Sequence, residues 1–296
     1  MTVLEVIKRS AEFLAKKGVE ESRLHAELLL AHVMRLPRMQ LYLNFERPLK
    51  AGELDSYREM VRRRALREPL QHIVGSTSFC GLEIAVNRQV LIPRPETELL
   101  AEQGWQFLST LAPTKSVLNE GTTTRGGPSA LDFGTGSGCV ALALAAKCPA
   151  AIIYALDISS EALETAALNA RNLGLSDRIK FLQGDHLAAI PEGLRFDLII
   201  SNPPYIPGAE IASLQPEVRD FDPRQALDGG SDGLDFYRRL AGEAPARLSA
   251  KGRLMVEFGD GQATAIRDLL QGQMWVVEAI LEDYTHRPRL LIARMQ

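Results

Sequence analysis

The chain has 296 residues, of which 46% are hydrophobic and 24% are charged, and its formal net charge is −3 at pH 7. This composition excludes a disordered chain, a collagen-like chain and a coiled-coil rod, and the length predicts about two globular domains. The small net charge also provides no dominant basic surface of the kind that favours non-specific nucleic-acid binding.

The cysteines and the N-terminus predict a cytoplasmic protein. Cys80, Cys139 and Cys148 form no Cys-x-x-Cys pair, and a sparse, odd set argues against a disulfide framework. The N-terminus mixes charged with apolar residues and lacks the continuous apolar stretch of a signal peptide. The longest uncharged apolar run, 139–146, is far short of the roughly 20 residues that cross a bilayer. We therefore expect no membrane association.

The first 75 residues predict a small, all-helical domain. Apolar residues recur at helical spacing from Val3, and Gly18 is placed to end this first helix. We expect further helices from Ser22 to about residue 34, briefly after Pro37, and along an apolar stripe over 54–65.

Residues 76–94 are interpreted as a β-hairpin that links two domains. Alternating apolar residues over 82–86 and 90–92 flank a turn at Asn87-Arg88. Pro93 and Pro95 close the hairpin and stiffen the entry to a helix over about 96–108.

Residues 95–296 are predicted to form an α/β domain. After a Gly- and Thr-rich stretch at 113–128, interpreted as a surface loop, strands and helices alternate, which favours a largely parallel sheet. The segments 275–281 and 289–293 have no helix between them, so we expect an antiparallel hairpin at one edge. The other expected strands are 130–133, 152–156, 179–182, 196–201 and 253–258, and the expected helices are 139–147, 161–172 and 234–248.

A glycine-rich turn follows the first of these strands and opens a helix. In Gly134-Thr135-Gly136-Ser137-Gly138 the glycines let the backbone turn tightly and approach a ligand next to the helix N–H groups. Asp157 ends the following strand about twenty residues on, where a carboxylate can accept hydrogen bonds from both hydroxyls of a ribose. Together they predict a nucleoside-bearing cofactor at the carboxyl ends of the strands.

The glycine spacing favours S-adenosylmethionine as this cofactor. A phosphate-binding loop needs Gly-Lys-Ser/Thr, which is absent, and a dinucleotide site would want Gly or Ala where this chain has Cys139. S-adenosylmethionine has no pyrophosphate, so its amino-acid end can meet the glycine loop directly. The loop 134–138 and Asp157 are therefore candidate cofactor-binding residues.

The tetrapeptide Asn202-Pro203-Pro204-Tyr205 follows the strand 196–201 and is the candidate catalytic loop. The prolines make it stiff and remove N–H donors, so it is rich in acceptors. The Asn202 side-chain oxygen and the Pro203 carbonyl can accept the two hydrogens of an –NH2 group, and Tyr205 offers an aromatic wall for a planar group. This pattern suits methyl transfer to an amino or amide nitrogen, whose attack is favoured when acceptors stabilise the positive charge that develops on it.

These motifs, in this order, resemble those of the class I S-adenosylmethionine-dependent amino-methyltransferases. Further segments narrow the resemblance to the protein-(glutamine-N5) methyltransferases called HemK or PrmC, which methylate the glutamine of the Gly-Gly-Gln motif in peptide chain release factors. The resemblance covers the chain from about Glu68 to the C-terminus. Its segments are Glu68-Pro69-Leu70-Gln71 with Gly75, Phe79 and Gly81-Leu82-Glu83; Ile92-Pro93-Arg94-Pro95-Glu96-Thr97-Glu98; and Phe221-Asp222-Pro223-Arg224 with Ala226-Leu227-Asp228-Gly229-Gly230.

The resemblance implies a Rossmann-like class I methyltransferase sheet over 95–296, with the helical domain 1–75 helping to grip the release factor. It implies that S-adenosylmethionine is the cofactor and S-adenosylhomocysteine its product. Asp185 and His186, after the third strand, would lie beside the adenine. Asn202 would contact both the cofactor and, with the rest of its loop, the glutamine amide.

Several alternatives stay open. An adenine-N6 nucleic-acid methyltransferase would use the same tetrapeptide, although the slight acidity and the lack of a long basic segment count against it. A ribosomal-protein glutamine methyltransferase also shares the tetrapeptide but generally lacks the full segment 94–98. A NAD-dependent oxidoreductase disagrees with Cys139, and a non-catalytic binding module disagrees with the intact loop at 202–205. His25 and His32 have no carboxylate or cysteine at ligand spacing, so we expect no metal site.

Overall fold

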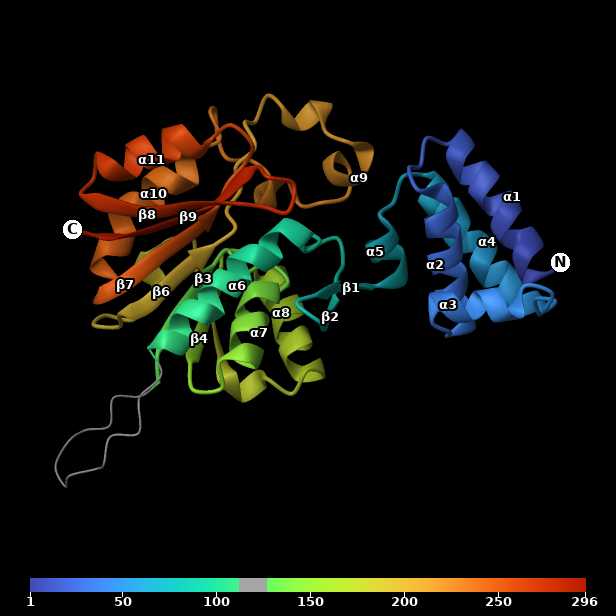
Figure 1. Cartoon of the computed structure of the whole chain (residues 1–296), viewed down its shortest axis with the longest axis horizontal. Helices are drawn as coiled ribbons and strands as arrows, with labels where there is room; N and C mark the ends of the chain where they lie inside the picture. The colour runs from blue at the N-terminus through green and yellow to red at the C-terminus, as the bar shows by residue number, and fades with distance from the viewer. Residues whose placement is uncertain (112–126) are drawn as a thin grey trace, which may run out of the picture. The chain divides into compact units, whose positions relative to one another are not determined.

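The computed structural model describes residues 1–111 and 127–296, in two compact units (Figure 1). The first unit comprises Met1–Ser76 together with Gln215–Phe221, and the second comprises Thr77–Leu214 and Asp222–Gln296. The loop that the sequence predicts at 113–128 lies, apart from its last two residues, outside the described residues.

The first unit is helical, as the sequence predicts, around its own apolar core. Thr2 begins the first helix with a capping box, in which its side chain accepts a hydrogen bond from the Glu5 backbone while the Glu5 side chain accepts one from the Thr2 backbone. The four expected helices are confirmed, and a fifth over 70–74 was not predicted. The helices are α1 (Val3–Lys16), α2 (Ser22–Met34), α3 (Arg38–Leu41), η1 (Tyr42–Asn44), α4 (Ala51–Ala65), α5 (Leu70–Val74) and α9 (Pro216–Arg219).

An ion-pair cluster attaches the distant segment 215–221 to this unit. Each oxygen of the Glu217 carboxylate lies 2.6 Å from a guanidinium nitrogen, one from Arg64 and one from Arg67. Burial alone would raise the pKa of Glu217, but the hydrogen bonds from the two arginines outweigh it and lower the pKa to about 2. Because the Arg64 side chain is itself buried, Glu217 is the partner that makes its burial tolerable.

The second unit is built on a seven-stranded sheet in the order β5-β4-β3-β6-β7-β9-β8. The strands from β5 to β7 are parallel, and β9 pairs antiparallel with both β7 and β8, which confirms the predicted mixed sheet with an antiparallel edge hairpin. The strands are β3 (Ser129–Phe133), β4 (Ile152–Asp157), β5 (Ile179–Gln183), β6 (Phe196–Ser201), β7 (Leu248–Glu257), β8 (Trp275–Glu282) and β9 (Pro288–Met295).

Helices cover both faces of this sheet and enclose two separate cores. Along β6, Leu198 and Ile200 belong to the core beneath α6, α7 and α8, whereas Ile199 belongs to the core beneath α10 and α11 (Figure 1). The sheet is therefore buried on both sides, and its strand ends are left to form the site. The helices are α6 (Pro95–Thr110), α7 (Cys139–Lys147), α8 (Ser160–Asn172), α10 (Asp235–Glu243) and α11 (Ala263–Gln271), with short 3₁₀ turns at η2 (Ser176–Arg178), η3 (Leu187–Ala189), η4 (Ile211–Ser213), η5 (Arg224–Ala226) and η6 (Ala244–Ala246).

A hairpin lies within 76–94 and the predicted strand over 82–86 is confirmed as β2, but the turn at Asn87-Arg88 and the strand over 90–92 were wrong. The hairpin forms between β1 (Ser76–Phe79) and β2 (Leu82–Ala85). Its turn is Cys80-Gly81, where φ is +50° and +79°, the left-handed pair that a two-residue hairpin requires. Asn87 instead makes a local turn, with its side-chain oxygen accepting a hydrogen bond from the Gln89 backbone.

Two further elements differ from the prediction. The helix expected over 234–248 ends at Glu243, because Pro245 lies two residues on and cannot continue it; the turn η6 follows, and Leu248 begins β7. The helix α11 was not predicted.

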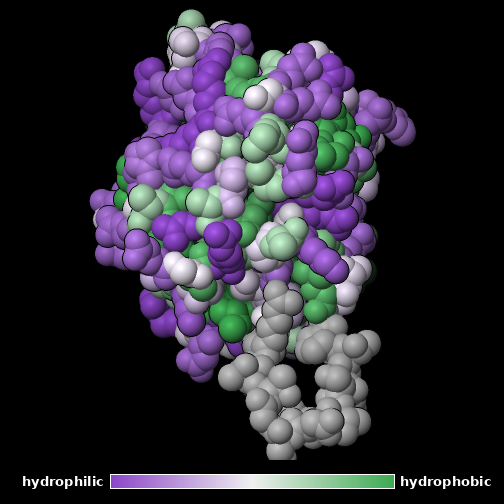
Figure 2. Space-filling view, turned by 90° about the vertical axis from the view of Figure 1, so that its left-hand side faces the viewer, coloured by the Kyte–Doolittle hydropathy of each residue, from purple (hydrophilic) through white to green (hydrophobic). Residues whose placement is uncertain are grey.

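The surface and the cysteines complete the description of the fold. The face shown in Figure 2 is largely hydrophilic, with apolar side chains scattered among polar ones. Within residues 1–111 and 127–296, no helix has the length and apolar character needed to cross a bilayer. Cys80, Cys139 and Cys148 are free thiols.

Candidate active site

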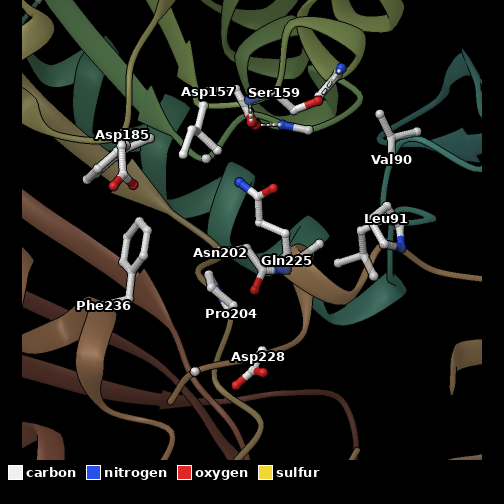
Figure 3. Close-up of a pocket in the computed structure, with 18 of the residues that line it drawn as sticks. Val90, Leu91, Asp157, Ser159, Asp185, Asn202, Pro204, Gln225, Asp228 and Phe236 are labelled. Carbon is white, nitrogen blue, oxygen red and sulfur yellow. Dashed lines mark hydrogen bonds between the residues drawn. The ribbon is translucent and has the colours of Figure 1, made fainter. Parts of the chain in front are cut away.

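A cavity of about 720 Å³ opens at the carboxyl ends of the parallel strands. Its volume lies in the usual range for a small-molecule site, and its position at the strand ends is where α/β sheets bind ligands. Figure 3 shows that residues from several elements face this space. Of the residues predicted from the sequence, those that line it are Gly134, Gly136, Asp157, Asp185, Asn202 and Pro204.

The glycine-rich turn brings its backbone to the cavity. Gly134 and Gly136 have φ of +76° and +54°, and no other heavy atom lies within 4 Å of where a Cβ would stand. The left-handed backbone explains glycine there, and the missing side chains leave room for a ligand. Gly138 has φ of +81°, and a Cβ there would lie 2.9 Å from Ala166 Cβ, so this glycine is required for packing against α8.

The two polar side chains of the turn face inward rather than into the cavity. Thr135 and Ser137 are both buried. The Thr135 hydroxyl donates to Asp132 Oδ2 at 2.6 Å, and the Ala141 backbone donates to the same oxygen at 3.1 Å. Asp132, which sequence analysis missed, therefore fixes the turn to the first turn of α7. Burial raises its pKa to about 7, with these hydrogen bonds offsetting only part of the effect.

Asp157 stands at the end of β4 and is also tied to the glycine turn. Its Oδ2 accepts a hydrogen bond from the Gly136 backbone at 2.8 Å, and its Oδ1 accepts one from the Ser159 backbone at 3.0 Å. Burial raises the pKa of Asp157, and the backbone donors oppose that shift. Each carboxylate oxygen keeps a second acceptor position, so the group can also receive two hydroxyl donors from a ligand.

Asp185 and His186, both expected beside the adenine, have different surroundings in the structure. Asp185 lines the cavity, and its Oδ1 accepts a hydrogen bond of 2.7 Å from Arg239. His186 is not among the lining residues; its ring nitrogens lie 2.7 Å from Glu243 Oε1 and 3.4 Å from Asp185 Oδ2. The pairing with Glu243 directs the imidazole toward α10, so Asp185 lines the cavity and His186 does not.

Only part of the candidate catalytic loop 202–205 lines the cavity. Asn202 and Pro204 line the cavity, and the Asn202 amide nitrogen donates to Thr97 Oγ1 at 3.0 Å. Pro203 is buried and Tyr205 is outside the lining, with its ring against Gly259. Of the four residues of this loop, the cavity is therefore lined by Asn202 and Pro204.

The segments that carry the family resemblance meet around this loop. Arg94 forms a 2.7 Å ion pair with the buried Asp222, and burial raises the pKa of Asp222 to about 6, although Arg94 opposes the shift. A Cβ at Gly229 would lie 2.9 Å from the Pro204 carbonyl oxygen, which explains glycine there. Residues 92–98, 202–205 and 222–230 thus pack together around Asn202.

Several lining residues were missed by sequence analysis, among them Gln225, Phe236 and Arg239. The Gln225 side chain extends into the cavity between Asp157 and Asn202, and Phe236 faces Asp185 (Figure 3). The Arg239 guanidinium lies 4.7 Å from the centre of the Phe236 ring. Gln225 lies within the segment 221–230, and this was its only signal in the sequence. Phe236 and Arg239 lie on α10, which reaches the site only through tertiary packing.

In the part of the chain that the structure describes, no cluster of three or more His, Cys, Asp or Glu residues could hold a metal ion.

Comparisons with known proteins agree with this fold. The hMettl16 catalytic domain in complex with MAT2A 3′UTR hairpin 6 aligns with a TM-score of 0.53 at 15% identity, over 83% of each chain. A T. thermophilus 16S rRNA methyltransferase in complex with AdoMet and guanosine aligns with a TM-score of 0.50 at 18% identity, over 75% of this chain and 50% of that one. At such identities the likeness concerns the fold alone, and it defines a class I methyltransferase fold.

Sequence relatives identify the family. Residues 5–75 match the model of the PrmC N-terminal domain, and residues 113–215 match the methyltransferase small domain. A release factor glutamine methyltransferase of Chlorobaculum tepidum is 42% identical over 100% of this chain and 98% of its own length, and one of Geobacter sulfurreducens is 44% identical over 90% and 87%. The chain belongs to the family of release factor glutamine methyltransferases.

The buried Asp132 predicts a pH dependence of stability. Because its folded pKa of about 7 lies above the ordinary value of 3.8, the folded protein holds this proton more tightly. The resulting stabilisation is present at low pH and is lost as pH rises toward 7. The quantity to compare is the difference between the free energies of unfolding of the wild type and of Asp132→Asn. This difference should fall by up to about 1.4 kcal/mol per pH unit between pH 5 and 7 and then level off.

Urea unfolding at pH 5, 6, 7 and 8, at constant ionic strength, measures this difference. The exposed Asp177→Asn variant is the control and should follow the wild type at every pH. Parallel curves for Asp132→Asn and the wild type would show that Asp132 is not held protonated by burial.

Proposed function

We propose that this protein transfers a methyl group from S-adenosylmethionine to the side-chain amide nitrogen of the glutamine in the Gly-Gly-Gln motif of a peptide chain release factor. The observation that supports it most is the Asn202 carboxamide at the cavity, with its nitrogen already bonded to Thr97 and its oxygen therefore the end left for a ligand. The names of the relatives support the release factor as substrate over a nucleic acid or a ribosomal protein.

The residues around the cavity fit S-adenosylmethionine. Gly134 and Gly136 leave backbone open to the space, and Asp157 retains acceptor positions for the two ribose hydroxyls. Asp185 with the nearby Phe236 ring forms the polar and apolar sides of a pocket suited to an adenine. When bound, the cofactor supplies an electrophilic methyl group on a sulfonium, and S-adenosylhomocysteine is the product.

The chain's own contribution is to orient and polarise the acceptor amide. A carboxamide nitrogen is a weak nucleophile because its lone pair is delocalised into the carbonyl. In our proposal Asn202 Oδ1 accepts one of its N–H groups and stabilises the positive charge that forms as the nitrogen attacks. Pro203, whose carbonyl is the second acceptor expected from the sequence, is buried outside the cavity lining. Alignment for in-line displacement can supply roughly 7–11 kcal/mol of barrier reduction in a well-oriented reaction. The loop needs no strong base, since the amide proton can leave to water after transfer.

We further propose that the helical unit helps to bind the release factor and that the protein acts in the cytoplasm. The unit has its own core, as a separate recognition module needs. Three free thiols favour a reducing compartment.

The direct test is label transfer. Incubation with S-adenosylmethionine carrying a labelled methyl group and a purified release factor should label one glutamine, located by peptide mapping. A release factor with that glutamine replaced by alanine is the matched substrate control and should stay unlabelled. Label that persists in the control, or that enters protein-free RNA or DNA instead, would contradict the proposal.

Substitutions at Asn202 and Asp157 should separate catalysis from cofactor binding. We expect Asn202→Ala to lower kcat by about 10²–10³, because one preorganised acceptor is lost, while the Kd for S-adenosylmethionine changes little. Asp157→Ala should weaken S-adenosylmethionine binding first. Calorimetric Kd values and steady-state rates for both variants measure the contrast, and an equal loss of cofactor affinity in Asn202→Ala would show that Asn202 has another role.

A further inference from the structure

Asn169 lies on α8 with its side chain fully buried, and its amide is hydrogen-bonded at both ends. Its Oδ1 accepts from the Ala85 backbone N–H at 2.8 Å. Its Nδ2 donates to the Ala85 carbonyl at 3.0 Å and to the Ser137 carbonyl at 2.9 Å. Because a backbone N–H can only donate and a carbonyl can only accept, these three partners fix the orientation of the amide. Burying an amide is costly unless its polar groups are paired, and here the oxygen and both N–H groups are paired.

These hydrogen bonds join two segments that line the cavity. Ser137 belongs to the glycine-rich turn 134–138, which contributes two of its glycines to the lining. Ala85 ends β2, and the residues 89–91, a few positions further on, line the cavity as well. Asn169 itself is not among the lining residues, so it acts on the cavity through these two segments.

A second contact with α8 holds the chain between Ala85 and the segment 89–91. Asn87 Nδ2 donates to Thr165 Oγ1 at 3.0 Å, and Asn87 Oδ1 accepts from the Gln89 backbone at 2.8 Å. Thr165 lies four residues before Asn169, so both side chains are on the same face of α8. The segment that leads into the cavity lining is therefore attached to this helix at two points.

The helix α8 also supports the glycine-rich turn and the start of the cofactor site. Its Ala166 Cβ is the atom that a side chain at Gly138 would meet at 2.9 Å. Ser159, which caps the helix, accepts a hydrogen bond from the Ala162 backbone and lines the cavity. One helix thus carries two separate parts of the cavity lining.

We propose that Asn169 is a positioning residue that sets the spacing between the segment 89–91 and the glycine-rich turn, and thereby the affinity for S-adenosylmethionine. Figure 3 shows Leu91 and Phe236 on opposite sides of Asn202, so this segment bounds the cavity on the side away from Phe236. A shift of either segment changes the room for the cofactor and the backbone that meets it. The proposal rests on the proposed function and deepens it, because the cofactor would contact the two segments that Asn169 holds together.

Calorimetry with S-adenosylhomocysteine measures the effect of removing the amide. Asn169→Leu has nearly the same volume and loses all three hydrogen bonds. Its Kd should rise by about tenfold, within the usual range for coupling between a ligand and a group that it does not touch. Asn172→Leu, the same change at an exposed position on the same helix, is the control and should keep the wild-type Kd. Urea unfolding identifies the temperature at which each variant is folded, and a folded Asn169→Leu with the wild-type Kd would overturn the proposal.

Thr165 gives a milder test with a conservative rescue. Thr165→Val removes the hydroxyl that accepts from Asn87 and should raise the Kd by about two- to tenfold, as expected for the loss of one neutral hydrogen bond. Thr165→Ser keeps the hydroxyl and should retain the wild-type Kd. Residues that only stabilise the fold would lower the free energy of unfolding and leave the Kd of the folded protein unchanged. That result in both Asn169→Leu and Thr165→Val would contradict a positioning role.

Hydrogen exchange in the wild-type full chain needs no variant. Ala85 does not line the cavity, but Asn169, which accepts from its amide, is bonded to the glycine-rich turn. The buried Phe196 amide, bonded to the Arg247 carbonyl at the opposite end of the sheet, reports the general stabilisation that any ligand gives. Saturating S-adenosylhomocysteine should slow exchange at Ala85 more than at Phe196, because it also suppresses local opening.

Equal slowing at the two amides would overturn the proposal, even if Asn169→Leu does not fold. If S-adenosylhomocysteine binds with the expected pattern but no release factor is methylated, the proposed function fails and the positioning role of Asn169 remains. If the wild type does not bind S-adenosylhomocysteine, both fail.

Discussion

The Asn202 amide nitrogen donates a hydrogen bond to Thr97, and this contact leaves the amide oxygen as the end available to a ligand. An amide nitrogen attacks poorly in water, so an enzyme that uses one must present acceptors to its hydrogens before the reaction begins. Nearly every feature around the loop serves to keep that arrangement rigid. Pro203 and Pro204 stiffen the backbone, and Gly229 allows a second segment to press against the Pro204 carbonyl.

Several ionisable groups are buried around the site. Asp132, Asp222 and Glu257 each have a pKa raised by burial, and all three lie at or beside the strand ends that form the cavity. An apolar residue of similar size would cost less to bury. Their concentration here, with Asp132 bonded to the glycine turn and Asp222 bonded to Arg94, fits the general rule that functional sites carry perturbed acids.

The sequence predicted the sheet and the chemistry better than the surroundings of the site. Strong periodicity placed the strand 196–201 and the helix 139–147 at the bounds that the structure has. Asp157 and Asn202 were found because both directly follow apolar strands. The hairpin failed because the alternation over 82–92 outweighed the stronger turn signal of Gly81. Thr97 and Phe236 could not be placed, since Asn202 and Phe133, which they contact, lie more than 100 positions away and only the folded sheet brings them together.

The central claim is tested most directly by a structure of the protein with S-adenosylhomocysteine and a Gly-Gly-Gln peptide. The account predicts the glutamine side-chain nitrogen at about 3 Å from Asn202 Oδ1, facing the sulfur, with the Asn202 nitrogen still on Thr97. A glutamine amide bound away from the sulfur, or an Asn202 that turns its nitrogen to the peptide, would contradict it.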